Sequence, residues 1–253
     1  MSASPPTVRV RALSLSFGRR QVLGDLDLTL EAGRWTGLLG RSGVGKSSLL
    51  RVLAGLIGAQ GASDAISCDD GGRVKGRVAY MAQQDLLLPW LSVLDNVTIG
   101  FRLRGGRAAA AAARPRALDL LRRVGLGERS ADLPKALSGG MRQRAALART
   151  LMEDRPIVLM DEPFSALDSI TRQRLQDLAA ELLSGRTVLL VTHDPLEALR
   201  LCHKVHVLQG MGRPLAAPIV IPGSLPPRPS DDPAVLAKQG DLLRQLAAWE
   251  EAA

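Results

Sequence analysis

Alternating and continuous apolar segments divide this chain into strands and helices. Residues Val8–Phe17 and Val22–Leu30 alternate apolar and polar positions, the first with one phase slip, which predicts two antiparallel strands with one face toward solvent. The continuous apolar runs Ile157–Met160 and Thr187–Thr192 are typical of buried parallel strands. We therefore expect an N-terminal antiparallel β subdomain followed by an α/β core with a mainly parallel sheet.

Helical spacing and short strands complete the predicted core. A short strand, Trp35–Leu39, precedes a helical pattern at Ser47–Leu56. A further strand is expected at Arg77–Ala82, and a helix over Thr171–Leu183 separates the two continuous apolar runs. The Gly-rich segment GRSGVGKS lies between that first strand and helix, so strand, loop and helix follow in the order that a P-loop NTPase core requires.

A mostly helical stretch interrupts this core. It covers about residues 86–152, opens on a capping-box-like pair, Ser92 and Asp95, and contains many strong helix formers. We interpret it as an inserted α-helical subdomain of a main domain spanning residues 1–225. Residues 226–253 are expected to form a tail that ends in one short amphipathic helix.

The composition indicates what class of protein this is, but it does not identify the molecule that the protein binds. The chain has 253 residues, of which 46% are hydrophobic, and no stretch approaches the roughly 20 apolar residues of a membrane span. The N-terminus lacks the pattern of a signal peptide, and Cys68 and Cys202 have no metal-type spacing, so we expect a cytoplasmic protein with reduced cysteines. The net charge of +8 is compatible with nucleic acid, anionic lipid or nucleotide, or simply with a solvated Arg-rich surface.

The stretch that follows the strand Trp35–Leu39 reads GRSGVGKS and fills the P-loop pattern G-x-x-x-x-G-K-[ST]. In such a loop, backbone N–H groups surround phosphate oxygens, Lys46 reaches the β- and γ-phosphates, and the Ser47 hydroxyl ligates Mg²⁺. The alternative is a Gly-rich turn before a helix. The nucleotide-binding residues predicted in this loop are Gly40, Arg41, Ser42, Gly43, Val44, Gly45, Lys46, Ser47 and Ser48.

Two acids end an apolar run in the segment IVLMDEPFSALD. Asp161 is placed to hold Mg²⁺ through water, and Glu162 to orient or deprotonate the attacking water. The structural alternative is an acidic pair that caps the next helix. The local sequence leaves both a structural and a functional interpretation open for four further residues, namely His193, Phe17, Gln83 and Gln84.

A second anion-binding pattern, LSGGMRQR, places a serine and two glycines at the start of a helix. With GRSGVGKS, a strand-end Gln, VLMDEP, SALD and a strand-terminal His, it resembles the nucleotide-binding subunits of ATP-binding cassette (ABC) transporters over most of the chain. The resemblance implies that ATP and Mg²⁺ are the cofactors. It makes Glu162 the catalytic carboxylate, His193 the switch histidine and Phe17 the adenine-stacking aromatic, with Lys46 and Gln83 completing the catalytic set.

In this family two cassettes pack head to tail, so the P-loop of one faces the LSGG of the other. The resemblance therefore implies that Ser138, Gly139, Gly140 and Gln143 act on ATP bound by a second subunit, and that Asp168 of SALD lies at the dimer seam. It also implies that Mg²⁺ is held by Ser47, Gln83 and Asp161, the last through water.

The stretch QQDLLLPWLSVLDNV resembles the importer group for nitrate, sulfonates, taurine and thiamine precursors, in which Gln precedes Pro-Trp by six residues. Counting back from Pro89 selects Gln83 rather than Gln84. The implied protein is an ATPase peripheral to the cytoplasmic face of the membrane, with a separate permease and, indirectly, a solute-binding protein as partners. We expect a thiamine pyrimidine precursor slightly ahead of sulfonates or nitrate; the competing class is a cassette ATPase acting on nucleic acid or the ribosome.

Overall fold

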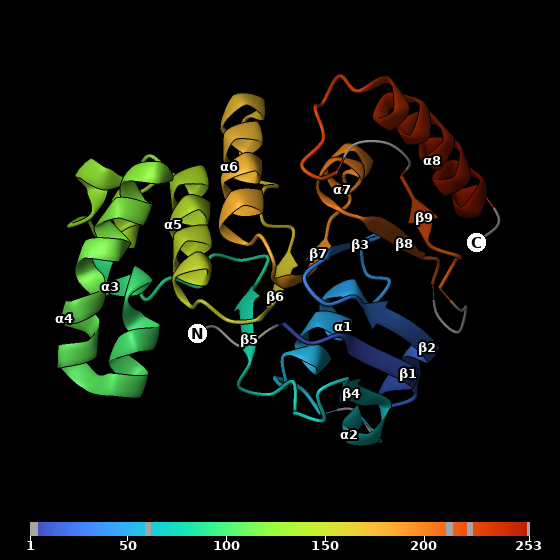
Figure 1. Cartoon of the computed structure of the whole chain (residues 1–253), viewed down its shortest axis with the longest axis horizontal. Helices are drawn as coiled ribbons and strands as arrows, with labels where there is room; N and C mark the ends of the chain where they lie inside the picture. Colours follow the sequence, from blue (N-terminus) through green and yellow to red (C-terminus); the bar gives the residue numbers. More distant parts are fainter. Residues whose placement is uncertain (1–4, 59–61, 211–214, 222–224, 252–253) are drawn as a thin grey trace. The chain divides into compact units, whose positions relative to one another are not determined.

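The computed structural model describes residues 5–58, 62–210, 215–221 and 225–251, and the chain divides into two compact units (Figure 1). The first unit contains the chain up to Val78, Arg155–Glu162, and the chain from Ser184 onward. The second unit contains Ala79–Asp154 and Pro163–Leu183. Across the described ranges, none of the helices is both long and apolar enough to cross a lipid bilayer.

An antiparallel sheet of order β2-β1-β4 forms one part of the first unit. Its strands are β1 (Val8–Phe17), β2 (Arg20–Leu30) and β4 (Ile66–Cys68). The phase slip predicted in β1 is a bulge between Val10 and Leu13, where Ala12 has a φ of 47° and its N–H donates to the Asp27 carboxylate at 2.9 Å. Because the bulge absorbs extra residues, Val10 and Leu13 are both buried. Strand β4 lies in a stretch where the sequence predicted no strand.

The second sheet has the order β5-β6-β7-β3-β8-β9. Its strands are β3 (Trp35–Gly40), β5 (Val78–Met81), β6 (Ile157–Asp161), β7 (Thr187–Val191), β8 (Lys204–Leu208) and β9 (Ile219–Val220). The pairs β6–β7, β3–β7 and β3–β8 are parallel, and β8–β9 is antiparallel. Every residue of β3, β6 and β7 is buried, which confirms the mainly parallel core predicted from the continuous apolar runs.

The described residues of the first unit form helices α1 (Lys46–Leu53), α2 (Ala62–Ala65), α7 (Pro195–Leu201) and α8 (Pro233–Glu251). Helix α1 ends earlier than predicted because Gly55 adopts a left-handed φ of 70° just after it. Helix α8 packs on α7. In the Pro-rich segment between them, the buried Arg228 donates through Nη1 to the carbonyls of Leu199 and Cys202, both at 2.8 Å.

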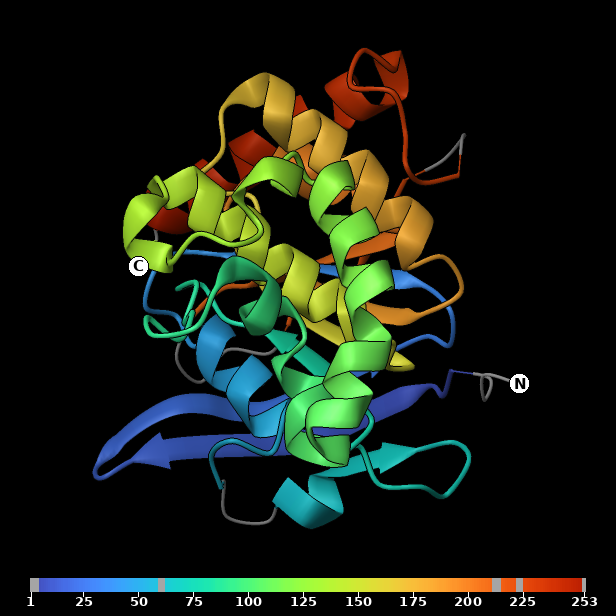
Figure 2. The same ribbon diagram turned by 90° about the vertical axis from the view of Figure 1, so that its left-hand side faces the viewer.

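The second unit is mostly helical, as predicted. Its helices are α3 (Val93–Val97), α4 (Ile99–Arg123), the short 3₁₀ helices η1 (Gly127–Arg129) and η2 (Pro134–Ala136), α5 (Gly139–Met152) and α6 (Ser169–Leu182). Helices α3, α4 and α5 contact one another and form the group coloured from blue-green to yellow-green in Figure 2. Ser92 caps α3 by accepting from the Asp95 N–H at 3.1 Å, as the capping-box pattern predicted. Arg123 of α4 pairs with Glu181 of α6 at 2.7 Å.

Candidate functional site

The P-loop joins the buried strand β3 to α1, and two of its glycines are required by space. A Cβ on Gly40 would lie 2.6 Å from the Leu208 carbonyl oxygen, and one on Gly45 would lie 2.8 Å from Cγ1 of Val22. Both glycines have positive φ, of 154° and 109°. Gly45 is the N-cap of α1 and supplies no side-chain hydrogen bond, so no side chain at the cap competes with an anion for the first N–H groups of the helix.

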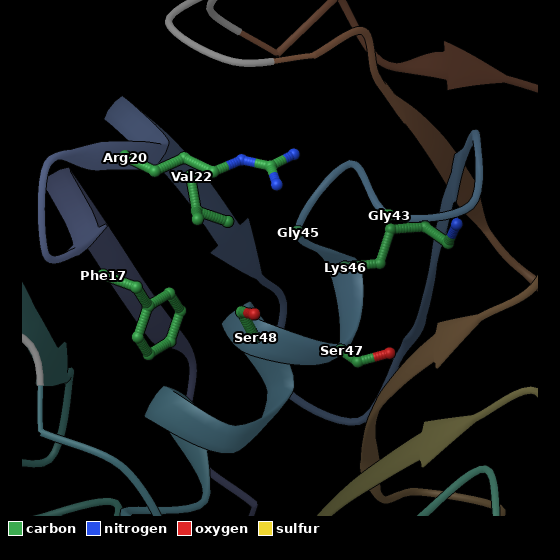
Figure 3. Close-up of a pocket in the computed structure, with 8 residues that line it drawn as sticks. All are labelled: Phe17, Arg20, Val22, Gly43, Gly45, Lys46, Ser47 and Ser48. Atoms are coloured by element: carbon green, nitrogen blue, oxygen red, sulfur yellow. The ribbon is translucent and has the colours of Figure 1, made fainter.

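A cavity of about 380 Å³ lies beside this loop (Figure 3). Six of the predicted nucleotide-binding residues line it: Phe17, Gly43, Gly45, Lys46, Ser47 and Ser48. Phe17 is 51% exposed, which excludes the alternative that it is a core residue. Gly40, Arg41, Ser42 and Val44 form the rest of the loop outside this lining.

Arg20 and Val22 also line the cavity, and neither was predicted from the sequence. They carry no motif, since Arg20 is one of two adjacent arginines in a turn and Val22 reads as an ordinary strand residue. The available signal was the hairpin register, in which Arg20 pairs with Phe17 across the turn.

Lys46 is held inside the loop that it follows. Its Nζ donates to the carbonyl oxygens of Gly40 at 2.6 Å and Arg41 at 2.9 Å, and the residue is only 6% exposed. Burial lowers the pKa of Lys46, while the nearby carboxylates Glu162 and Asp161 raise it. Phosphate oxygens are stronger partners for an ammonium than neutral carbonyls, so a bound nucleotide can recruit this side chain.

Asp161 ends strand β6 with 2% exposure and accepts a hydrogen bond from the Ser47 side chain. Burial raises the pKa of this carboxyl, and the Ser47 hydrogen bond lowers it. A hydroxyl and a buried carboxylate are oxygen donors of the kind that Mg²⁺ accepts together with phosphate oxygens and water. Within the described residues there is no cluster of three or more His, Cys, Asp or Glu that could hold a metal by itself. The residues therefore fit a magnesium ion bound jointly with a nucleotide.

Glu162 and His193 form a pair at the ends of two adjacent strands. His193 Nδ1 lies 3.1 Å from Glu162 Oε2, and the Glu162 N–H donates to the Val191 carbonyl at 2.8 Å. Glu162 has a left-handed φ of 49°, which is unusual for a residue with a side chain. Its side chain is 13% exposed and that of His193 is 61% exposed, so the carboxylate is sheltered while the imidazole is open to solvent.

The remaining predicted site residues belong to the second unit. Gln83 follows β5 and is exposed. Ser138 is the N-cap of α5 and accepts from the Met141 N–H at 3.3 Å. A Cβ added to Gly139 would meet no atom closer than 3.9 Å, whereas one on Gly140 would lie 3.1 Å from the Ala166 carbonyl oxygen. The start of α5 thus packs against the SALD segment through Gly140 and is open at Gly139.

Gln143 and Asp168 have structural partners in this second unit. Gln143 is 5% exposed and donates through Nε2 to the Pro163 carbonyl at 3.1 Å. Asp168 is the N-cap of α6, and the hydrogen bond from the Thr171 N–H at 3.0 Å holds its pKa below the usual range. Their contacts with a second subunit remain predictions.

Comparisons with known proteins agree with this geometry. Residues 23–165 match the protein family described as ABC transporter. An uncharacterised ABC transporter ATP-binding protein from Haemophilus influenzae is 42% identical over 94% of this chain and 98% of its own length. An aliphatic sulfonates import ATP-binding protein from Delftia acidovorans is 42% identical over 96% of this chain and 95% of its own length, and one from Rhodococcus jostii is 45% identical over 91% and 84%.

A solved structure also matches the fold. It is a dimeric ATP-binding cassette in a post-hydrolysis state with ADP and phosphate bound. The TM-score is 0.73 at 28% identity, over 86% of this chain and all of the other. A second dimeric structure of that cassette matches with a TM-score of 0.70 over the same share of this chain.

Proposed function

We propose, from the premise that the chain belongs to the ABC transporter family, that it is the ATP-hydrolysing subunit of an importer for aliphatic sulfonates. The observation that carries this proposal is the set of candidate catalytic residues that the first unit contains. A P-loop lysine, a buried strand-end carboxylate beside the P-loop serine, and a paired carboxylate and histidine lie together in one compact unit.

Each of these residues would have its own role in phosphoryl transfer. Lys46 would stabilise charge on the β- and γ-phosphates, and Ser47 and Asp161 would hold the Mg²⁺ that neutralises the transferred group. Glu162, sheltered and next to His193, would orient or deprotonate the attacking water. Gln83 would join the magnesium site when ATP is bound.

The LSGG segment would act on ATP bound by another copy of this chain. It resembles a helix N-terminus prepared for an anion, and related cassettes are dimeric. In a head-to-tail dimer, Ser138, Gly139, Gly140 and Gln143 would complete the partner's site, and Asp168 would lie at the seam. Binding of two nucleotides would then close the dimer and hydrolysis would open it.

The second unit would pass this motion to a separate permease in the membrane. Trp90 follows Pro89 next to the start of the helical segment and is 71% exposed, so its indole is free to enter a partner surface. We place the protein at the cytoplasmic face of the membrane for this reason, with a solute-binding protein as an indirect partner.

Sulfonate replaces the thiamine precursor as the proposed cargo because relatives from two organisms, each covering most of this chain, are named for aliphatic sulfonates. The test is reconstitution with the permease and solute-binding protein of an aliphatic sulfonate importer. We expect ATP hydrolysis to rise when the binding protein carries an alkanesulfonate, and not with nitrate or a pyrimidine. Stimulation by either of those instead would overturn the cargo, and retention on DNA at about 0.15 M salt without the permease would support the nucleic-acid alternative.

A further inference from the structure

A second cation besides Lys46 lines the nucleotide cavity and has no part in the proposed hydrolysis. Arg20 begins strand β2, opposite Phe17 in the hairpin register. Figure 3 shows its side chain extending from β2 toward the P-loop near Gly45, while the Phe17 ring lies lower on the same side of the cavity. The adjacent Arg19 is also exposed but is not part of the lining.

The charge of this cavity is one-sided. Of the residues described around it, none carries a carboxylate, and the cations are Arg20 and Lys46. Arg20 makes no ion pair or side-chain hydrogen bond within the described part of the chain, whereas Lys46 is bonded to two loop carbonyls. An exposed guanidinium with no protein partner, facing a cavity bordered by a phosphate-binding loop, is suited to bind an anionic ligand group.

The position of Arg20 indicates which group of a bound nucleotide its guanidinium contacts. If the base stacks on Phe17 and the P-loop surrounds the β- and γ-phosphates, the ribose and the α-phosphate span the distance between them. Of these two groups only the α-phosphate is an anion, and a planar guanidinium fork matches phosphate oxygens. We infer that Arg20 binds the α-phosphate of the nucleotide from the hairpin side of the cavity, opposite the P-loop. This inference rests on the proposed nucleotide-binding function.

The test compares two ligands that need no hydrolysis, ADP and inorganic tripolyphosphate, each titrated with Mg²⁺ into the full chain by calorimetry. Arg20→Gln should weaken both by about five- to tenfold, the effect of one partly exposed charge contact. Phe17→Ala should weaken ADP but leave tripolyphosphate unchanged, because only ADP has a base. Arg20→Lys should recover part of the loss, and the matched control Arg19→Gln should change neither affinity.

The possible results separate this inference from the proposed function. If the unmodified chain binds both ligands and Arg20→Gln binds them equally well, Arg20 has no contact and only the inference fails. If Arg20→Gln weakens ADP but not tripolyphosphate, the residue contacts the nucleoside and the phosphate assignment is wrong. If the unmodified chain binds neither ligand, the nucleotide function itself fails. Because Arg20 is exposed, its variants should keep the unfolding midpoint of the unmodified chain, which verifies that folding is intact.

Discussion

Two helices of this protein start with an anion-binding pattern, and they differ in what surrounds that start. Gly45, the N-cap of helix α1, supplies no side-chain cap, and the buried Lys46 and Asp161 belong to the same compact unit. Ser138, the N-cap of helix α5, does cap its helix, because its hydroxyl accepts from the Met141 N–H. The first start has the buried lysine and carboxylate expected of a phosphate site, and we interpret the second as part of a site that another subunit completes.

The basic residue nearest Gly139 does not change this conclusion. Arg142 approaches Gly139, but its guanidinium already bonds to the Asp85 carboxylate at 3.0 Å and to the Leu137 carbonyl at 2.8 Å. The LSGG sequence also contains no lysine. A helix start that keeps N–H groups for an anion but has no cation reserved for it is suited to a phosphate whose charge is already balanced elsewhere.

The largest expected effect is the loss of ATP hydrolysis at the P-loop site without loss of ATP binding. Glu162→Gln should lower kcat by about 100-fold or more, since it removes the group that positions or deprotonates water, and should keep ATP affinity. Single-turnover hydrolysis and equilibrium binding measure the two effects separately. The control is Glu128→Gln, an exposed acid in η1, which should hydrolyse ATP normally. Near-normal turnover by Glu162→Gln would remove Glu162 from its role.

His193→Ala should have the next largest effect, about tenfold or more on kcat. The imidazole contacts the Glu162 carboxylate at 3.1 Å and is exposed, so its loss leaves the fold intact but frees the carboxylate to move. The measurement is steady-state ATPase activity with the unfolding midpoint recorded beside it. Unchanged turnover in a normally folded variant would show that the contact is only structural.

Trp90→Ala should affect coupling rather than chemistry. Because the indole is 71% exposed, the variant should keep both stability and the ATPase activity of the isolated subunit, but lose most of the stimulation by the permease. Leu243→Ala, which truncates an exposed apolar residue on α8, is the matched control. Loss of stability instead of coupling would make Trp90 a packing residue.

The smallest expected effect concerns the cap of α5. Ser138→Ala should reduce the free energy of unfolding by about 1 kcal/mol, the usual cost of losing an N-cap. Ser138→Asn supplies another good cap and should restore stability. If the Ser138 hydroxyl also contacts a partner's γ-phosphate, Ser138→Asn should restore folding but not turnover. Full recovery of turnover by Asn would limit Ser138 to capping.

Much of the fold could be predicted because its signals are local. The continuous apolar runs gave the buried strands β6 and β7, and Ser92 marked the start of α3 at its observed position. Strand β4 was missed because its three residues lie in an irregular stretch and pair only with β1, far away in the sequence. Short strands are set by their partners rather than by their own periodicity.

In the candidate site, too, only the local features could be predicted from the sequence. Motif residues such as Lys46 and Asp161 were predictable, since a P-loop and a strand-end acid are visible in sequence. The hydrogen bond of the Ser47 side chain to Asp161 and the Glu162–His193 contact were not predictable, because each joins elements that only the folded sheet brings together. The place of Arg20 in the cavity was missed although the hairpin turn puts it opposite Phe17.

The claim that LSGG completes a site on another subunit is tested most directly by complementation. One chain carries Lys46→Ala and the other Gly139→Asp, a change for which the structure leaves room and which adds a negative charge at the helix start. Each homodimer then has two broken sites. In a head-to-tail heterodimer both lesions fall in one composite site and the other is native, so random pairing rebuilds about a quarter of all sites. Single-turnover ATP cleavage in the mixture should recover to about that fraction. No recovery in verified heterodimers would contradict the shared site and leave LSGG as an ordinary helix start.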